Sequence, residues 1–256
     1  IVWSIMATGL ALVAARHRAF RRFAIFGHFW RADPARFTEI VRLGLPIALT
    51  LWSEGAVFAA AVGLMGLIDE SSVAAHAVAL QLAALTFMVP LGLGQAATVR
   101  VGLGYGRRDA AAIRRAGWTA FALGTCFMTA MAVLMWSFPH RLVGFFLEPT
   151  AANAPVIELA VRFLGVAAAF QIFDGAQVVG AGMLRGLQDT RWPMVFAVFG
   201  YWPIGIGVGS YFAFRLHWEG VGVWTGLAAG LATVSLLMLW RWTRRERLGL
   251  VVSSKG

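Results

Sequence analysis

The sequence predicts an all-α, polytopic membrane protein, and three observations support this fold class. Hydrophobic residues make up 59% of the 256 residues and charged residues only 13%, whereas a soluble domain carries about 25% charged residues. Six apolar runs are each long enough to cross a hydrocarbon core of about 30 Å as a helix. The basic residues lie between these runs in an alternating pattern, which is typical of membrane proteins with several spans.

The six full runs follow a shorter apolar stretch. They are approximately Leu43–Ile68, Val73–Val99, Ala116–Phe138, Pro155–Leu184, Pro193–Phe214 and Gly220–Trp240. The shorter stretch, residues 1–15, lacks a charged leader and is followed by arginines, so it does not resemble a signal peptide. We expect it to be the end of a further span, and the chain to be the C-terminal part of a longer protein.

Positive charge marks one set of alternate loops. All but three of the 22 lysines and arginines lie before the first full run, after the second, after the fourth or after the sixth. The exceptions are Arg141, Arg162 and Arg215. Because cytoplasmic loops are enriched in Lys and Arg, we expect these four segments, and the C-terminus, to be cytoplasmic. Topology and contact with anionic membrane lipid account for the net charge of +10, so no nucleic-acid partner is expected.

Two acidic residues lie deep inside apolar runs, Glu54 in the first full run and Asp174 in the fourth. A charge at this depth costs at least about 2.5 kcal/mol, so such residues usually face a cavity on an ion or proton path. Glu54 is about 16 Å from the cytoplasmic start of its run, and Asp174 is about 15 Å from the cytoplasmic end of its own. Because the two depths agree, we predict one shared site for H⁺ or Na⁺.

Amide side chains flank one of these acids. Gln171 and Gln177 lie three residues before and after Asp174, and we expect the three to share a helix face. An acid with neighbouring amides can bind a cation or hold a proton, and the two then compete for one carboxylate. The alternative is a buried acid that serves only packing, through hydrogen bonds to other helices.

Internal prolines interrupt three of the runs. Pro46 lies one turn into the first, Pro90 lies in the second and Pro203 lies in the middle of the fifth. Each frees a backbone carbonyl and permits a bend, and interrupted helices line the substrate path of transporters. Pro90 and Pro203 are therefore candidates for the lining of the site, with helix packing as the alternative.

The other polar motifs do not indicate a catalytic site, a metal site or an ion filter. His76 stands at the outer start of the second run and is predicted to be an interfacial cap, with pH sensing as the alternative. Residues 102–106 (GLGYG) look like a potassium filter, but they lie in a predicted cytoplasmic loop, where a glycine-rich turn is expected. The sequence shows one cysteine, Cys126, and no zinc spacing or nucleophile–base pair. We therefore expect no enzyme and no cofactor.

Four stretches of the chain resemble one transporter family. The more specific matches are A-A-H-x-x-A with P-x-G-x-x-x-A-x-x-V-R-x-G, and G-x-x-R-G-x-x-D-T-R-x-P. The four stretches are LGLPIALTLWSE (43–54), VAAHAVALQLAALTFMVPLGLGQAATVRVGLGYG (73–106), FQIFDGAQVVGAGMLRGLQDTRWPM (170–194) and GVGVWTGLAAG (220–230), and the specific matches lie in the second and third of them. In these stretches the chain is similar to the C-terminal half of the MATE (multidrug and toxic compound extrusion) family of efflux transporters.

The resemblance implies a transporter of twelve helices in two six-helix lobes, of which this chain holds one. Residues 1–15 would be the end of helix 6, and residues 16–36 a basic cytoplasmic linker between the lobes. Residues 37–248 would be the C-terminal lobe and residues 249–256 a cytoplasmic tail. The missing partner would be the N-terminal lobe of the same protein.

For function, the resemblance implies an antiporter of the bacterial inner membrane that exports organic cations or drugs in exchange for H⁺ or Na⁺. Glu54 and Asp174 stand where many bacterial members of one branch of the family carry the cation-site acids of this lobe. Some members carry Tyr one turn before that Asp, and here the residue is Phe170. The absent hydroxyl removes an oxygen that Na⁺ would favour, so the preference is for H⁺.

A flippase of the same superfamily, which moves a lipid-linked oligosaccharide, is the main alternative. A flippase is expected to have a more cationic cavity for pyrophosphate, whereas the sequence places no Lys or Arg deep in a run. A channel or a structural membrane subunit would not need two acids at one depth. The sequence therefore favours the antiporter.

Overall fold

The computed structural model describes residues 2–17 and 33–251, which divide into two compact units, Ile1–Arg42 and Leu43–Gly256. The first unit holds α1 (Val2–Arg16) and the beginning of α3 (Pro34–Gly66), and the remainder of α3 belongs to the second unit. Most of the predicted linker and the end of the predicted tail, residues 18–32 and 252–256, lie outside the described residues.

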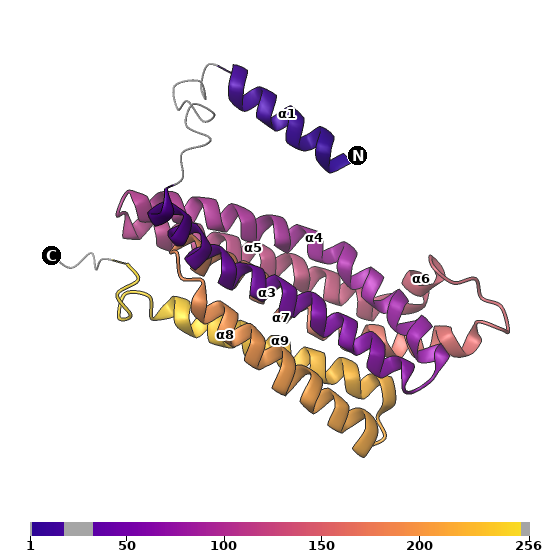
Figure 1. The fold of residues 1–256 in the computed structure, drawn as a ribbon. Helices are drawn as coiled ribbons and strands as arrows, with labels where there is room; N and C mark the ends of the chain where they lie inside the picture. Colours follow the sequence, from indigo (N-terminus) through magenta and orange to yellow (C-terminus); the bar gives the residue numbers. More distant parts are fainter. Residues whose placement is uncertain (1, 18–32, 252–256) are drawn as a thin grey trace. The chain divides into compact units, whose positions relative to one another are not determined.

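Among the described residues, six helical segments are long and apolar enough to cross a membrane, as the sequence predicts. They are α3, α4 (Glu70–Gly106), α5 (Ala110–Ser137), α7 (Ala154–Gly186), the segment from α8 (Arg191–Phe199) to Arg215, and α9 (Glu219–Thr243). A short helix, α6 (Pro139–Gly144), follows α5, and no strand occurs in the described residues. Figure 1 shows the second unit as a bundle in which the turns after α4 and α7 lie at the same end.

The contact between α4 and α7 is the most extensive in the bundle, and it depends on facing glycines. A Cβ atom on Gly182 would lie 2.2 Å from the carbonyl oxygen of Gly94, and one on Gly186 would lie 2.8 Å from that of Thr98. No side chain fits at such distances, so the two backbones lie in direct contact. Across this contact Thr98 Oγ1 donates a hydrogen bond to the carbonyl of Gly182 at 3.0 Å.

Residues 102–106 do not form a turn, so that prediction is wrong. They form the last turns of α4, and the chain reverses just after them, where Arg108 has a φ of 56°. Packing accounts for glycine at position 104, because a Cβ there would lie 3.0 Å from the side chain of Ile113 on α5. Gly104 thus lets α5 approach the last turn of α4 closely.

The fifth membrane segment departs from α-helical geometry in its middle. After α8 the chain forms π-helical turns in η1 (Gly200–Val208) and η2 (Tyr211–Arg215). Pro203 lies inside η1, and because proline has no N–H it cannot make the usual helical hydrogen bond. The interruption expected at Pro203 therefore takes the form of a widened helix.

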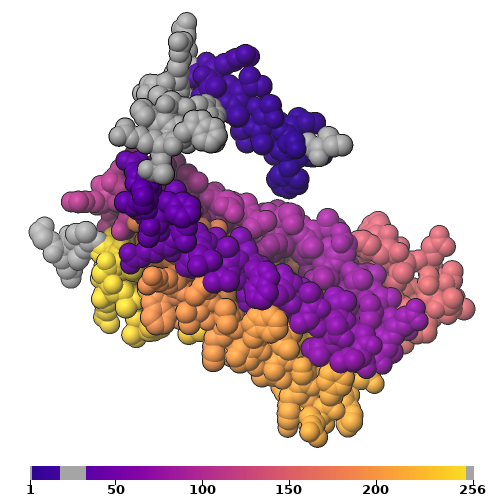
Figure 2. Space-filling model, viewed as in Figure 1, coloured from indigo at the N-terminus to yellow at the C-terminus, as the bar shows by residue number. Residues whose placement is uncertain are grey.

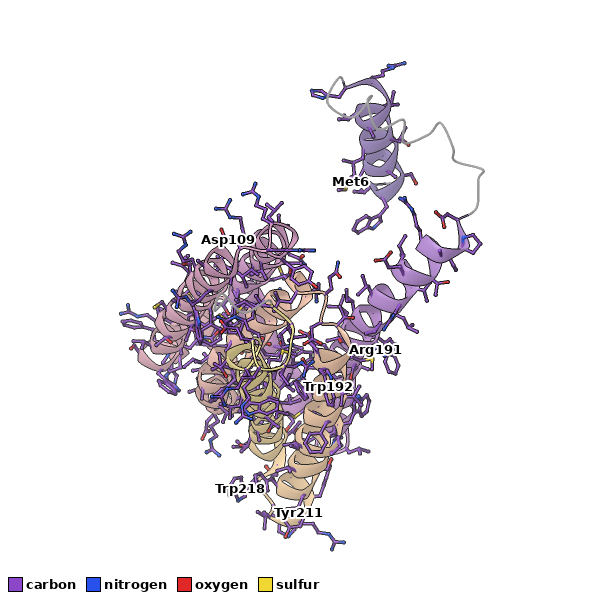
Figure 3. All side chains as sticks on the ribbon, turned by 90° about the vertical axis from the view of Figure 1, so that its left-hand side faces the viewer. Met6, Asp109, Arg191, Trp192, Tyr211 and Trp218 are labelled. Carbon is purple, nitrogen blue, oxygen red and sulfur yellow. The ribbon has the colours of Figure 1, made fainter. Side chains whose placement is uncertain are left out.

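A buried ion pair joins the α7–α8 turn to the end of α9. Arg241 donates through Nε to Asp189, and both side chains are buried. The Arg241 guanidinium also lies 5.1 Å from the ring centre of Trp192, which Figure 3 labels at the start of α8. One arginine of the predicted cytoplasmic set thus also stabilises the fold.

Replacing Gly182 with alanine is expected to lower the melting temperature of the purified protein. The added methyl would collide with the α4 backbone, and overpacking of this kind costs about 1–3 kcal/mol. Gly165→Ala on the same helix is the matched control, because its Cβ would meet nothing within 4 Å. Equal melting temperatures for the two variants would contradict the direct contact between α4 and α7.

Candidate functional site

Glu54 lines a small pocket between α3, η1 and α9, and its side chain is half-buried. Glycines bring the pocket walls together, since a Cβ on Gly230 of α9 would lie 2.9 Å from the Cα of Gly205 in η1. Beside the acid, Trp202 Nε1 donates a hydrogen bond to Ser53 Oγ at 3.0 Å and so ties η1 to α3. Figure 2 shows α3 on the surface next to the orange α8–η1 segment. The other lining residues are Val57, Phe58, Tyr201, Leu227 and Leu231.

Asp174 lies in the middle of α7 and is 5% exposed. Its Oδ1 atom has no hydrogen-bond partner among the described residues. Asp174 and Glu54 lie near enough for their charges to act on each other. Two ionised acids at this depth would repel each other and lose their hydration, which is costly inside an apolar bundle. The two acids that the sequence singled out thus influence each other electrostatically, although Asp174 is not among the residues that line the Glu54 pocket.

Tyr201 belongs to the same site, although no pattern in the sequence had pointed to it. It lines the Glu54 pocket and is 2% exposed, and its hydroxyl has no partner among the described residues. The charges of both Glu54 and Asp174 act on its phenol. The available signal was a tyrosine in the middle of an apolar run, because a buried hydroxyl usually finds a hydrogen-bond partner.

Phe170 belongs to an aromatic cluster beside the acids. Its ring centre lies 6.2 Å from that of Phe58 on α3 and 5.4 Å from that of Trp224 on α9. His76 continues the cluster at 5.3 Å from Trp224 and is only 1% exposed. The prediction of an interfacial cap is therefore wrong for His76. Because α4 begins at Glu70, His76 lies well inside the helix and faces α9 rather than the membrane surface.

The two glutamines near Asp174 have different surroundings. Gln171 accepts a hydrogen bond from Thr86 of α4 at 2.9 Å and donates one to the carbonyl of Met128 of α5 at 3.4 Å. Gln171 thus links three helices, and its amide is engaged on the side of α4 and α5. Gln177 is 1% exposed, and its Oε1 has no partner among the described residues. Of the two amides, Gln177 is the one with an oxygen still available.

Neither proline proposed as site lining lies in the Glu54 pocket. Pro90 is buried on α4, with its Cβ 4.0 Å from the Cβ position of Gly124 on α5, and so it serves packing between these helices. Pro203 is exposed on the surface of the second unit. Its effect on the site is indirect, through the π-helical turns that carry Tyr201.

Arg185 adds a positive charge to the environment of Glu54. The sequence placed it among the cytoplasmic loop residues, but it lies in the last turn of α7 and is half-buried. Its charge acts on Glu54, and it lines a second small pocket together with Thr50 and Asp189. Glu54 thus interacts with a positive charge as well as with the charge of Asp174.

The donor set around the acids is small. Among residues 2–17 and 33–251, no cluster of three or more His, Cys, Asp or Glu side chains could hold a metal ion. Two neutral oxygens without described partners belong to residues near the acids, the Tyr201 hydroxyl and Gln177 Oε1. A Na⁺ ion at Glu54 and Asp174 would draw on these oxygens, whereas a proton needs only one carboxylate.

Comparison with known proteins identifies the family. The family model MatE matches residues 46–210, which is more than half of the chain and includes both acids. The chain belongs to the MatE family. Curated relatives of this MatE chain include the probable multidrug resistance protein NorM of Mesorhizobium japonicum, 52% identical over 246 residues, and that of Brucella suis, 55% identical over 242 residues.

The MatE chain spans about half the length of these curated relatives. The alignments cover 96% of it and 53% of the Mesorhizobium protein, and 94% of it and 51% of the Brucella protein. Among solved structures, the eukaryotic MATE transporter AtDTX14 matches 96% of this chain and 56% of its own, with a TM-score of 0.81 at 19% identity. At this identity the likeness is one of fold, and it confirms the all-α membrane bundle.

Replacing Tyr201 with phenylalanine is expected to weaken the site without harming the fold. Because the hydroxyl is buried without a described partner, its removal should leave the melting temperature unchanged or raise it. The shift in melting temperature that Na⁺ or acid produces should become smaller. Tyr211→Phe is the matched control, since Tyr211 is 56% exposed. Identical ion-dependent shifts in the two variants would remove Tyr201 from the site.

Proposed function

We propose that this chain is the C-terminal lobe of a cation-coupled multidrug antiporter, which exports organic cations or drugs in exchange for H⁺ or Na⁺. The observation that carries the proposal is the pair of acids, Glu54 and Asp174, whose charges act on each other inside an apolar bundle. Membership of the MatE family and the multidrug resistance proteins among its relatives support an efflux transporter.

The pair can couple two movements because its charge changes when it binds an ion. With H⁺ or Na⁺ bound, the site is closer to neutral and costs less to enclose in an apolar environment. Without the ion, the free carboxylate attracts a cation. A conformational change that encloses the site thus becomes dependent on the ion, and an ion gradient can drive export of the substrate.

A second lobe is the proposed partner of this chain. Alternating access requires one bundle to move against another around a fixed site. The chain spans about half the length of its curated relatives, which is consistent with one lobe of two. We place the turns after α4 and α7 and the segment after α9 in the cytoplasm of a bacterial cell, since these basic segments gather at one end of the bundle (Figure 1).

We propose H⁺ rather than Na⁺ as the coupling ion. Phe170 supplies no oxygen, and aromatic rings from α3 and α9 surround it. Tyr201 does supply a hydroxyl near both acids, so Na⁺ is the second coupling ion to test.

Asp174→Asn, made in the full-length protein, is expected to reduce gradient-driven export to background. The amide keeps the shape of the side chain but can neither release a proton nor hold a cation by charge. Substrate binding should fall much less, because it depends on a larger surface. The measurement is export of a fluorescent organic cation from liposomes, with equilibrium binding of the same dye to the purified protein.

The matched control is Glu158→Gln, which neutralises an exposed acid on the same helix, paired only with Arg162 at the surface. It should export at the wild-type rate. Export is driven first by a Na⁺ gradient at fixed pH and then by a pH gradient without Na⁺. Strong export under Na⁺ alone would overturn the preference for H⁺. Near wild-type export by Asp174→Asn under both gradients would overturn the assignment of the site.

A further inference from the structure

A larger cavity, separate from the two acids and from the pocket at Arg185, lies between the end of α4 and the beginning of α5. It has a volume of about 480 Å³. Three arginines line it, Arg100 from α4, Arg107 from the turn after α4 and Arg115 from α5, together with Thr119 and the leucines Leu103 and Leu123. None of these residues takes part in the proposed ion coupling. Arg100 is the arginine of the motif P-x-G-x-x-x-A-x-x-V-R-x-G.

The three guanidinium groups give the cavity a concentrated positive charge. Within the described part of the chain, none of the three arginines forms a salt bridge. The carboxylate in the adjoining turn, Asp109 (Figure 3), accepts a hydrogen bond from the backbone N–H of Ala112 at 2.9 Å and caps α5. Asp109, the acid nearest to these arginines in the sequence, is therefore already engaged as the cap of α5. A ligand with a phosphate group fits this charge.

The other walls of the cavity are apolar. Leu103 and Leu123 are 51% and 55% exposed, and the lining continues along α4 to Leu93. Leu93 is seven residues from Arg100, which corresponds to about 10 Å along the helix toward the middle of the span. The cavity thus has a charged end near the turn and an apolar end at membrane depth. Free phosphate would use only the first end, and an organic cation would be repelled by it.

We propose that this cavity binds one anionic glycerophospholipid. Its phosphate lies among Arg100, Arg107 and Arg115, and one acyl chain lies along Leu93, Leu103 and Leu123. The charge of the cavity complements an anionic headgroup, and its position at the predicted cytoplasmic end of the bundle is where anionic lipids contact basic residues. The site is distinct from the general attraction of basic loops to a membrane, because it has walls for the acyl chain.

The test measures lipid retained on the protein in a neutral detergent, by native mass spectrometry with added phosphatidylglycerol or phosphatidylcholine. Arg100→Gln with Arg107→Gln is compared with Arg108→Gln and Arg114→Gln, which remove two exposed arginines, one in the α4–α5 turn and one on α5, that do not line the cavity. The first pair should bind phosphatidylglycerol about 25-fold more weakly, at about fivefold for each guanidinium, and the second pair should bind it normally. Phosphatidylcholine should be retained weakly by all proteins.

A second variant tests the apolar end without changing charge. Ala96 lines the cavity, so Ala96→Trp should fill it and displace the lipid, whereas Val99→Trp, at an exposed position outside the cavity, should not. Melting temperatures confirm that each variant is folded. Equal losses in the two arginine pairs, binding of glycerophosphate as tight as that of the long-chain lipid, or normal lipid binding by Ala96→Trp would each overturn the proposal.

Discussion

Two carboxyl groups, on Glu54 and Asp174, lie inside an apolar bundle close enough for their charges to interact, and the rest of the site is arranged around this constraint. An isolated charge in such a place is costly, and a second charge of the same sign increases the cost. We therefore propose that the pair favours states in which a proton or a cation is bound. Tyr201, Gln177 and Arg185 add a hydroxyl, an amide and a positive charge to the surroundings of these acids.

The helix packing makes this arrangement possible through backbone contacts rather than through large side chains. Gly182 and Gly94 let α7 lie directly against α4, and Gly230 and Gly205 let α9 approach η1 beside Glu54. In a membrane the hydrophobic effect does not draw helices together, so close approach at small residues supplies much of the packing energy. The π-helical turns around Pro203 then place Tyr201 in the pocket.

The sequence predicted the features that depend on hydrophobicity along the chain. Six spans and two acids at equal depth can be read from apolar runs, because a bilayer sets the length of a helix and penalises a charge. The same reasoning could not tell which way a side chain points inside the bundle. His76 was therefore assigned to the surface although it packs against Trp224, and Gln171 was grouped with Asp174 although it bonds to Thr86 and Met128. Residues 102–106 were assigned to a turn because glycine permits turns, whereas they continue α4 and Gly104 permits close packing against α5.

The central claim is that Glu54 and Asp174 form one site that a proton and a cation share. Infrared difference spectroscopy of the full-length protein in lipid measures it directly, through the carbonyl stretch of a protonated carboxylic acid. We expect this band to disappear when the pH is raised, and to weaken at fixed low pH when a transported organic cation or Na⁺ is added. Asp174→Asn should remove this band. Because each acid influences the other, Glu54→Gln should leave the band in place but shift its dependence on pH. A band that Asp174→Asn leaves intact, or one that is unaffected by Glu54→Gln and by every cation, would contradict the shared site.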